Sequence, residues 1–161
     1  MGFTSIGYDQ LAAWRDGDGD LPPRPIMWDC DHPVKGILGI GRVLEKYGMA
    51  GNLFVNTGLL REQPEPAGQV AADRGGPALT WDEIRGLRDA GWSIGAHTVT
   101  HPNLSALVAD DPEGTALLAE FDENDAEIER EIGAAPSDFA FTSTTWSSVA
   151  ESLVAVSIRE I

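Results

Sequence analysis

The sequence predicts an α/β fold, because short apolar runs alternate with amphipathic helical patterns along its 161 residues. The apolar runs that are typical of strands lie at residues 25–28, 52–56, 92–95 and 138–141. Strands that alternate with helices form a parallel sheet, so their carboxyl ends meet on one face and carry the functional loops. These units are too few to close a barrel, and we therefore expect an α/β sheet with an open edge.

A lead-in segment, residues 1–24, precedes the first predicted strand within the single domain that we expect over residues 1–161. Residues 16–25 contain Asp-Gly repeats and a proline-rich run, which sustain neither a helix nor a central strand. The apolar residues at 25–28 then bring Asp29, Cys30, Asp31 and His32 to the end of a buried strand. We expect regular structure to begin only at that strand.

The first predicted helix carries an apolar face made of Ile37, Ile40, Leu44 and Tyr47. Gly48 is placed to end this helix in the left-handed conformation. The continuous apolar centre of residues 52–56 is typical of a parallel strand that is covered on both faces. Residues 61–78 carry many glycines and prolines without hydrophobic periodicity, which predicts a long surface loop.

Three further helices are predicted after this loop. Thr80 and Glu83 form a capping box that begins a helix ending near residue 90. Asp111 is predicted to cap the next helix with Pro112 at its first position, and Gly133 ends it. Its apolar stripe consists of Leu117, Phe121, Ile128 and Ile132. A polar loop at residues 142–146 then leads to a last helix that contains Val149, Leu153 and Val156.

Composition limits the classes of partner. The formal net charge of −15 argues against a nucleic-acid partner, because phosphate binding needs clustered Lys and Arg side chains. Cys30 is the only cysteine, so neither an internal disulfide nor a cysteine-rich zinc site can form within the chain. We find no signal peptide and no apolar run long enough to cross a bilayer, and we expect a cytoplasmic protein with no membrane partner.

Two of the three histidines, His97 and His101, lie four residues apart directly after the third predicted strand. Imidazoles at this spacing converge from one helical face or from a tight loop, and they suit Zn, Co, Fe or Ni. Asp29 and Asp31 lie at the end of the first strand, on the same predicted edge of the sheet. One carboxylate can complete a metal site and the other can act as a base, although in isolation both can equally cap a turn.

A metal held by three protein ligands keeps an open position for water. It lowers the pKa of that water to about 7 and polarises a carbonyl group, which is the chemistry of amide or ester hydrolysis. The predicted reaction is therefore a metal-dependent hydrolysis. His32, which lies beside the site, is interpreted as a loop histidine in preference to a further ligand.

These motifs resemble those of the polysaccharide deacetylase superfamily, the NodB-homology domain of carbohydrate esterase family 4. Residues 28–31 (Trp-Asp-Cys-Asp) resemble its first motif, and residues 91–104 are similar to its His-Ser/Thr-x-x-His-Pro motif. The resemblance implies an incomplete, distorted (β/α) barrel of the NodB type. It also implies that the domain removes N-acetyl or related acyl groups from amino sugars, with Zn or Co bound. It implies that Asp29 is the general base and that Asp31, His97 and His101 hold the metal. The inserted Cys30 leaves open which aspartate ligates the metal.

The sequence departs from the family pattern in two places. Residues 139–146 contain neither the arginine nor the proline of the third motif, and Trp146 there either stacks on a sugar or covers the core. No histidine follows His101, whereas the family places a general-acid histidine in a late motif. The late barrel units are also missing, so we expect an open edge that a second copy of the chain can cover.

Two other functions stay open at this stage. A degenerate deacetylase-like domain would keep the pocket for binding a metal or a sugar without turnover. A hydrophobic strand that ends in Asp-x-Asp also resembles the haloacid-dehalogenase-like phosphohydrolases, in which the first aspartate, here Asp29, accepts a phosphoryl group. This last alternative leaves the histidine pair unexplained.

Overall fold

The computed structural model of the chain describes residues 2–61, 76–143 and 145–157. Its strands are β1 (Thr4–Ser5), β2 (Pro25–Ile26), β3 (Asp29–Asp31), β4 (Asn52–Val55) and β5 (Ser93–Ala96). Its helices are α1 (Tyr8–Asp16), α2 (Gly36–Glu45), α3 (Thr57–Arg61), α5 (Trp81–Asp89), α6 (Leu104–Asp110), α7 (Thr115–Ile132) and α8 (Ser148–Ser157). None of these described helices has both the length and the apolar character needed to cross a bilayer.

The central sheet has the strand order β3-β4-β5, and all its pairs are parallel. Asp31 lies opposite Phe54 in the register, and Val55 lies opposite Ala96. A single parallel bridge from Ala96 to Phe139 extends the sheet beyond β5. The predicted α/β fold is confirmed, and the sheet stays open within the described residues, as expected for an incomplete barrel.

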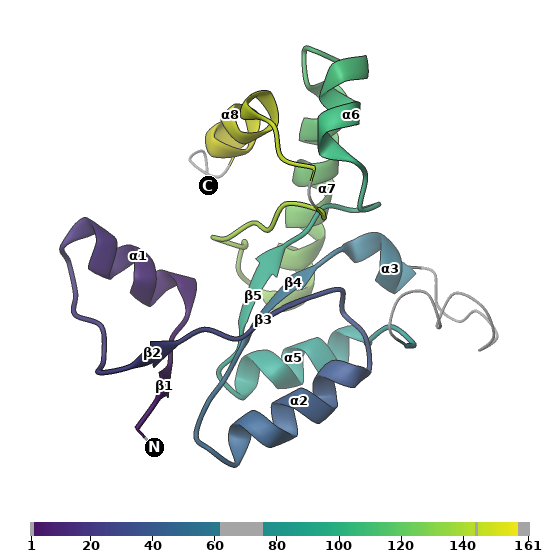
Figure 1. Cartoon of the computed structure of the whole chain (residues 1–161). Helices are drawn as coiled ribbons and strands as arrows, with labels where there is room; N and C mark the ends of the chain where they lie inside the picture. Colours follow the sequence, from purple (N-terminus) through teal and green to yellow (C-terminus); the bar gives the residue numbers. More distant parts are fainter. Residues whose placement is uncertain (1, 62–75, 144, 158–161) are drawn as a thin grey trace.

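One face of this sheet is covered by helices, as Figure 1 shows for α2 and α5. Leu53 and Val55 of β4 point to that face and pack with Ile37 of α2 and Ile84 of α5. A second apolar cluster joins α6, α7 and α8. Because side chains alternate along a strand, Asp29, Asp31, Asn52 and Phe54 lie on the opposite face, where α1 contributes the ring of Tyr8.

Several expected boundaries are confirmed. Gly48 (φ 65°) and Gly133 (φ 86°) both adopt the left-handed conformation at helix ends, where a side chain would be strained. Thr80 and Glu83 form the predicted capping box at the start of α5. The predicted loop at residues 61–78 lies mostly outside the described residues.

The N-terminal segment corrects the sequence interpretation. Regular structure was expected to begin at residue 25, but β1 and α1 precede that point. The segment is tied to the domain because β1 pairs with β2 and the Ser5 hydroxyl accepts a hydrogen bond from the Ala50 N–H (3.0 Å). The first predicted strand is also split, because β2 pairs with β1 while the aspartates themselves form β3 against β4.

Two later predictions also need correction. Asp111 does not occupy the cap position of α7, because its N–H donates to the Leu107 carbonyl (2.9 Å) at the end of α6, a helix that the sequence pattern did not predict. Its carboxylate nevertheless accepts a hydrogen bond from the Ala116 N–H (2.8 Å) in the first turn of α7. Gly114 occupies the cap position of α7 instead, with φ 75°. The strand predicted at residues 138–141 is reduced to the single bridge between Phe139 and Ala96.

Candidate metal centre

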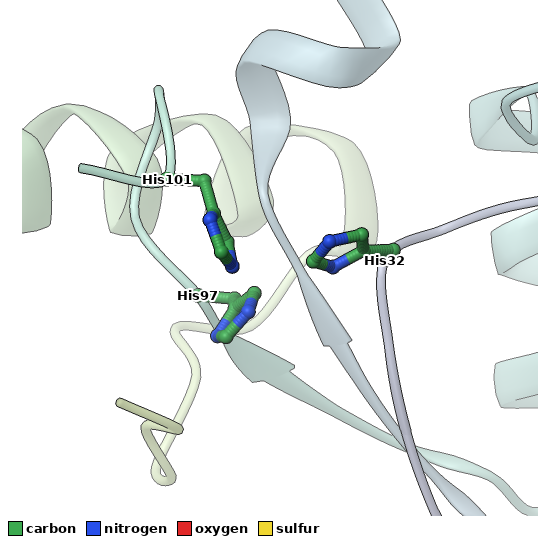
Figure 2. A group of neighbouring side chains, drawn as sticks. All are labelled: His32, His97 and His101. Atoms are coloured by element: carbon green, nitrogen blue, oxygen red, sulfur yellow. The ribbon is translucent and has the colours of Figure 1, made fainter. Parts of the chain in front are cut away.

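Three histidines gather at the carboxyl ends of β3 and β5. One ring nitrogen from each of His32, His97 and His101 lies within 4.8 Å of the other two. Figure 2 shows the three imidazoles facing one another, with His97 and His101 following β5 and His32 following β3. Their ring centroids are separated by 4.7 to 5.7 Å. Tetrahedral zinc with Zn–N bonds near 2.1 Å separates its nitrogen ligands by about 3.4 Å, so only small side-chain rotations separate this group from a metal site.

The tautomer of His97 is fixed by the surrounding backbone. Its Nδ1 lies 2.9 Å from the Ala140 carbonyl oxygen, and because a carbonyl only accepts, Nδ1 must carry the proton. The lone pair is therefore on Nε2, which is buried and has no hydrogen-bond partner. Nδ1 of His32 is likewise buried without a partner. Buried nitrogens of this kind are costly unless they bind something, and a metal ion satisfies both.

The charge state of His97 suits a ligand. Its side chain is only 1% exposed, and this burial lowers the pKa of His97. The hydrogen bond to Ala140 and the negative charge of Asp31 act in the opposite direction, while His101 and His32 add to the lowering. Burial prevails, so the imidazole is neutral at neutral pH, which is the form that binds metals.

The backbone around the histidines is held by α7. The side chain of Asn124 is fully buried; its amide donates to the carbonyls of Val55 (3.0 Å) and Thr98 (2.7 Å) and accepts from the His97 N–H (3.3 Å). Glu120, one turn earlier, accepts from the N–H groups of Val99 (2.8 Å) and Thr100 (2.9 Å). One helix therefore fixes the path of the chain from His97 onward.

The turn itself has an unusual backbone. His32, Thr98 and His101 all have positive φ, at 62°, 65° and 58°. Non-glycine residues rarely adopt this left-handed conformation, and such residues concentrate at functional sites. The Thr98 hydroxyl accepts a hydrogen bond from the His101 N–H (3.1 Å), which stabilises the turn that returns His101 toward His97.

The two predicted aspartates lie on one face of β3, and both are exposed. Asp29 accepts hydrogen bonds from the Tyr8 hydroxyl and from the Asn52 amide, each at 2.9 Å. Asp31 lies beside the site, since its negative charge acts on His97. The described side chains that are close enough to hold one metal ion are the three histidines, without Asp31. The structure thus brings His97 and His101 together as predicted and adds His32 to them.

Sequence reasoning missed three contributors. His32 was interpreted as a loop histidine, although its position directly after Asp31 in a chain with three histidines was a usable signal. Asn124 and Glu120 were missed because nothing in the helical pattern of α7 distinguishes them from other polar residues.

Trp146 is 58% exposed, so the alternative in which it covers the core is wrong.

A family model described as "Polysaccharide deacetylase" matches residues 31–155, well over half of the chain. The chain belongs to the polysaccharide deacetylase family. This membership agrees with the resemblance of the first and second motifs. It does not support the haloacid-dehalogenase-like alternative, which is a different family. No curated protein sequence matches the chain.

Solved structures of deacetylases share the fold. The Streptococcus pyogenes deacetylase PplD, determined in complex with acetate, has a TM-score of 0.80 at 16% identity, with 99% of this chain and 64% of that chain covered. The de-N-acetylase from Aggregatibacter actinomycetemcomitans has a TM-score of 0.82 at 17% identity, with 97% and 69% covered. BC0361, a polysaccharide deacetylase from Bacillus cereus, has a TM-score of 0.70 at 20% identity, with 99% and 43% covered. The chain therefore spans about two thirds of the first two proteins and less than half of the third.

Proposed function

We propose that the chain is a metal-dependent hydrolase that removes N-acetyl or related acyl groups from amino sugars, with zinc as the metal. The observation that carries this proposal is the group of three imidazoles in which His32 Nδ1 and His97 Nε2 are buried without hydrogen bonds. Family membership supplies the reaction class. A divalent metal at this position supplies Lewis acidity, lowering the pKa of water and polarising an acyl carbonyl.

The protein groups have separate tasks in this proposal. His32, His97 and His101 hold the metal, and the bond from His97 Nδ1 to Ala140 orients that ring and its lone pair. Asp31, the carboxylate that the family resemblance assigns to the metal, is proposed as the fourth ligand. The proposal is supported by its place beside His32 and by the action of its charge on His97.

Asp29 is proposed as the general base. It shares the solvent-facing side of β3 with Asp31, and its two oxygens are oriented by Tyr8 and Asn52. As base it takes the proton of the attacking water, so that hydroxide adds to the acyl carbon, and acetate and the amine leave. The amine must gain a proton to leave, and the proton that Asp29 has taken from water balances this step.

The test separates these two half-reactions. The zinc-loaded chain is assayed on p-nitrophenyl acetate, whose leaving group needs no protonation, and on an oligomer of N-acetylglucosamine, whose amine does. We expect ester hydrolysis that falls at least about 100-fold in Asp29→Asn with zinc content unchanged. A zinc-loaded wild-type chain that hydrolyses neither substrate would contradict the proposed activity.

The absence of the third-motif arginine from residues 139–146 favours a second candidate, a deacetylase-like domain that binds a metal or a sugar without turnover. It predicts zinc binding equal to that of an enzyme together with no hydrolysis of either substrate. The two candidates therefore agree in zinc binding and differ in the hydrolysis of the two substrates. Loss of ester hydrolysis in Asp29→Asn distinguishes the enzyme from adventitious hydrolysis by protein-bound zinc.

A further inference from the structure

The carboxylate of Asp29 is held on both oxygens by neutral donors. The Tyr8 hydroxyl donates to Oδ2 and the Asn52 amide donates to Oδ1, each over 2.9 Å. The second donor belongs to β4, the strand that pairs with β3, but the first comes from α1, which is 21 residues away in the sequence. A carboxylate with two directed hydrogen bonds has little freedom to rotate.

Tyr8 is itself held in place. Its ring packs edge-on against Phe54, with 5.5 Å between ring centroids, and Phe54 is buried in the central strand. The residue before it, Gly7, approaches the sheet so closely that a Cβ there would lie 2.9 Å from the Ser93 hydroxyl oxygen. The start of α1 is therefore docked against β4 and β5, and Tyr8 extends from a fixed point toward Asp29.

The Tyr8 hydroxyl remains a donor over the whole useful pH range. Burial and the hydrogen bond to Asp29 raise the pKa of Tyr8 to about 12. Residues 139–146 contain no arginine or lysine, so the third-motif segment supplies no cation to orient this carboxylate. The orienting groups that the described contacts do supply are this phenol and the Asn52 amide.

We propose that Tyr8 is a positioning residue that holds Asp29 in the orientation needed to take a proton from water. This inference rests on the proposed function, because it gives Asp29 the role of base. It assigns a role in the reaction to the N-terminal helix α1, which lies before the part of the chain that the family model matches. Tyr8 does not contact the substrate in this proposal; it acts through Asp29.

The chain contains its own matched control. It has two tyrosines, and Tyr47 is 73% exposed on the surface after α2. Tyr8→Phe keeps the ring against Phe54 and removes only the hydroxyl, while Tyr47→Phe removes an exposed hydroxyl that is not one of the two donors to Asp29. Both variants are made in the full chain, loaded with zinc and assayed on p-nitrophenyl acetate.

We expect Tyr8→Phe to lower kcat about 10-fold, with KM and zinc content unchanged, because only the orientation of the base is lost. Tyr47→Phe should match the wild type. In an Asp29→Asn background Tyr8→Phe should have no further effect, since its role depends on that carboxylate. A kcat unchanged in Tyr8→Phe, or an equal drop in the Asp29→Asn background, would overturn the inference.

The same variants distinguish a failure of the proposed function from a failure of the inference about Tyr8. If Asp29→Asn hydrolyses the ester as fast as the wild type, Asp29 is not the base, and the proposed function and the inference both fail. If Asp29→Asn is inactive and Tyr8→Phe is fully active, the proposed function stands and only the inference fails.

Discussion

The segment after β5 and the strand β3 contribute to the same candidate site, but the fold holds them in different ways. His97 and Thr98 are 1% and 0% exposed, and Asn124 fixes their backbone from α7. Asp29 and Asp31 lie exposed on β3, which is an edge strand of the described sheet. The segment after β5 is therefore part of the folding core, whereas β3 carries acidic groups that contribute little to stability. Substitutions on the two sides should separate these roles.

The largest effect on stability is expected from Asn124→Leu. This change leaves the Thr98 carbonyl buried without the amide that binds it, while the His97 N–H and the Val55 carbonyl keep their bond to each other (3.1 Å) and lose the amide. We expect it to lower the free energy of unfolding by about 3–5 kcal/mol. Urea denaturation measures the change, and Glu129→Gln on the exposed side of α7 is the control. An Asn124→Leu variant with the midpoint of the wild type would show that α7 does not hold this turn.

Two glycines should respond to alanine with opposite signs, because only Gly58 lies against the turn after β5. A Cβ on Gly58 would overlap the Val99 carbonyl oxygen, which already accepts a hydrogen bond from the Gly58 N–H (2.9 Å). We expect Gly58→Ala to destabilise the fold by about 1–3 kcal/mol. Gly86, on the exposed surface of α5, has open space around it, and Gly86→Ala should stabilise by about 0.5–1 kcal/mol. Thermal unfolding of both variants checks the signs; two changes of the same sign would contradict the account.

A smaller change in the free energy of unfolding is expected from the titration of Asp125 on α7. Asp125 lines a small cavity with Asp138 and Phe139, and burial together with the charge of Asp122 raises its pKa to about 6. Because the folded-state pKa lies above the unfolded value near 3.9, this group favours folding below that value and loses its contribution as the pH rises through about 6.

Asp125→Asn removes the loss of stability that follows ionisation of this carboxyl group. After allowance for partial exposure, we expect the variant to be more stable than the wild type by about 1 kcal/mol at pH 7, and to differ little in this respect at pH 3.5. Urea unfolding at the two pH values measures the difference. A stability gain that is larger at pH 3.5 than at pH 7 would reverse the sign and contradict the assignment.

The smallest change in stability is expected at Asp31. Its side chain is exposed, so Asp31→Ala should alter the free energy of unfolding by no more than about 0.5 kcal/mol. The same variant should bind zinc more weakly, because it removes the proposed fourth ligand. Parallel urea and zinc titrations of the variant measure both quantities. A large loss of stability with unchanged zinc affinity would show that Asp31 serves the fold and not the site.

The sequence predicted the parts of the site that depend on short-range order. The apolar runs of β4 and β5 placed His97 and His101 at a strand end, and the spacing of Asp29 and Asp31 placed both on one face of a strand. Tyr8 was not predicted, because its contact with Asp29 depends on how a distant helix docks. His32 was underestimated because its approach to His97 depends on a turn with positive φ, which local propensity does not favour for histidine.

Zinc titration tests the central claim most directly. The chain is treated with a chelator, dialysed at neutral pH and titrated calorimetrically with zinc chloride, in parallel with His32→Ala, His97→Ala and His101→Ala. We predict one zinc per wild-type chain and a loss of at least about 100-fold in affinity for each variant. No zinc uptake by the wild type, or wild-type affinity in His97→Ala, would contradict the account.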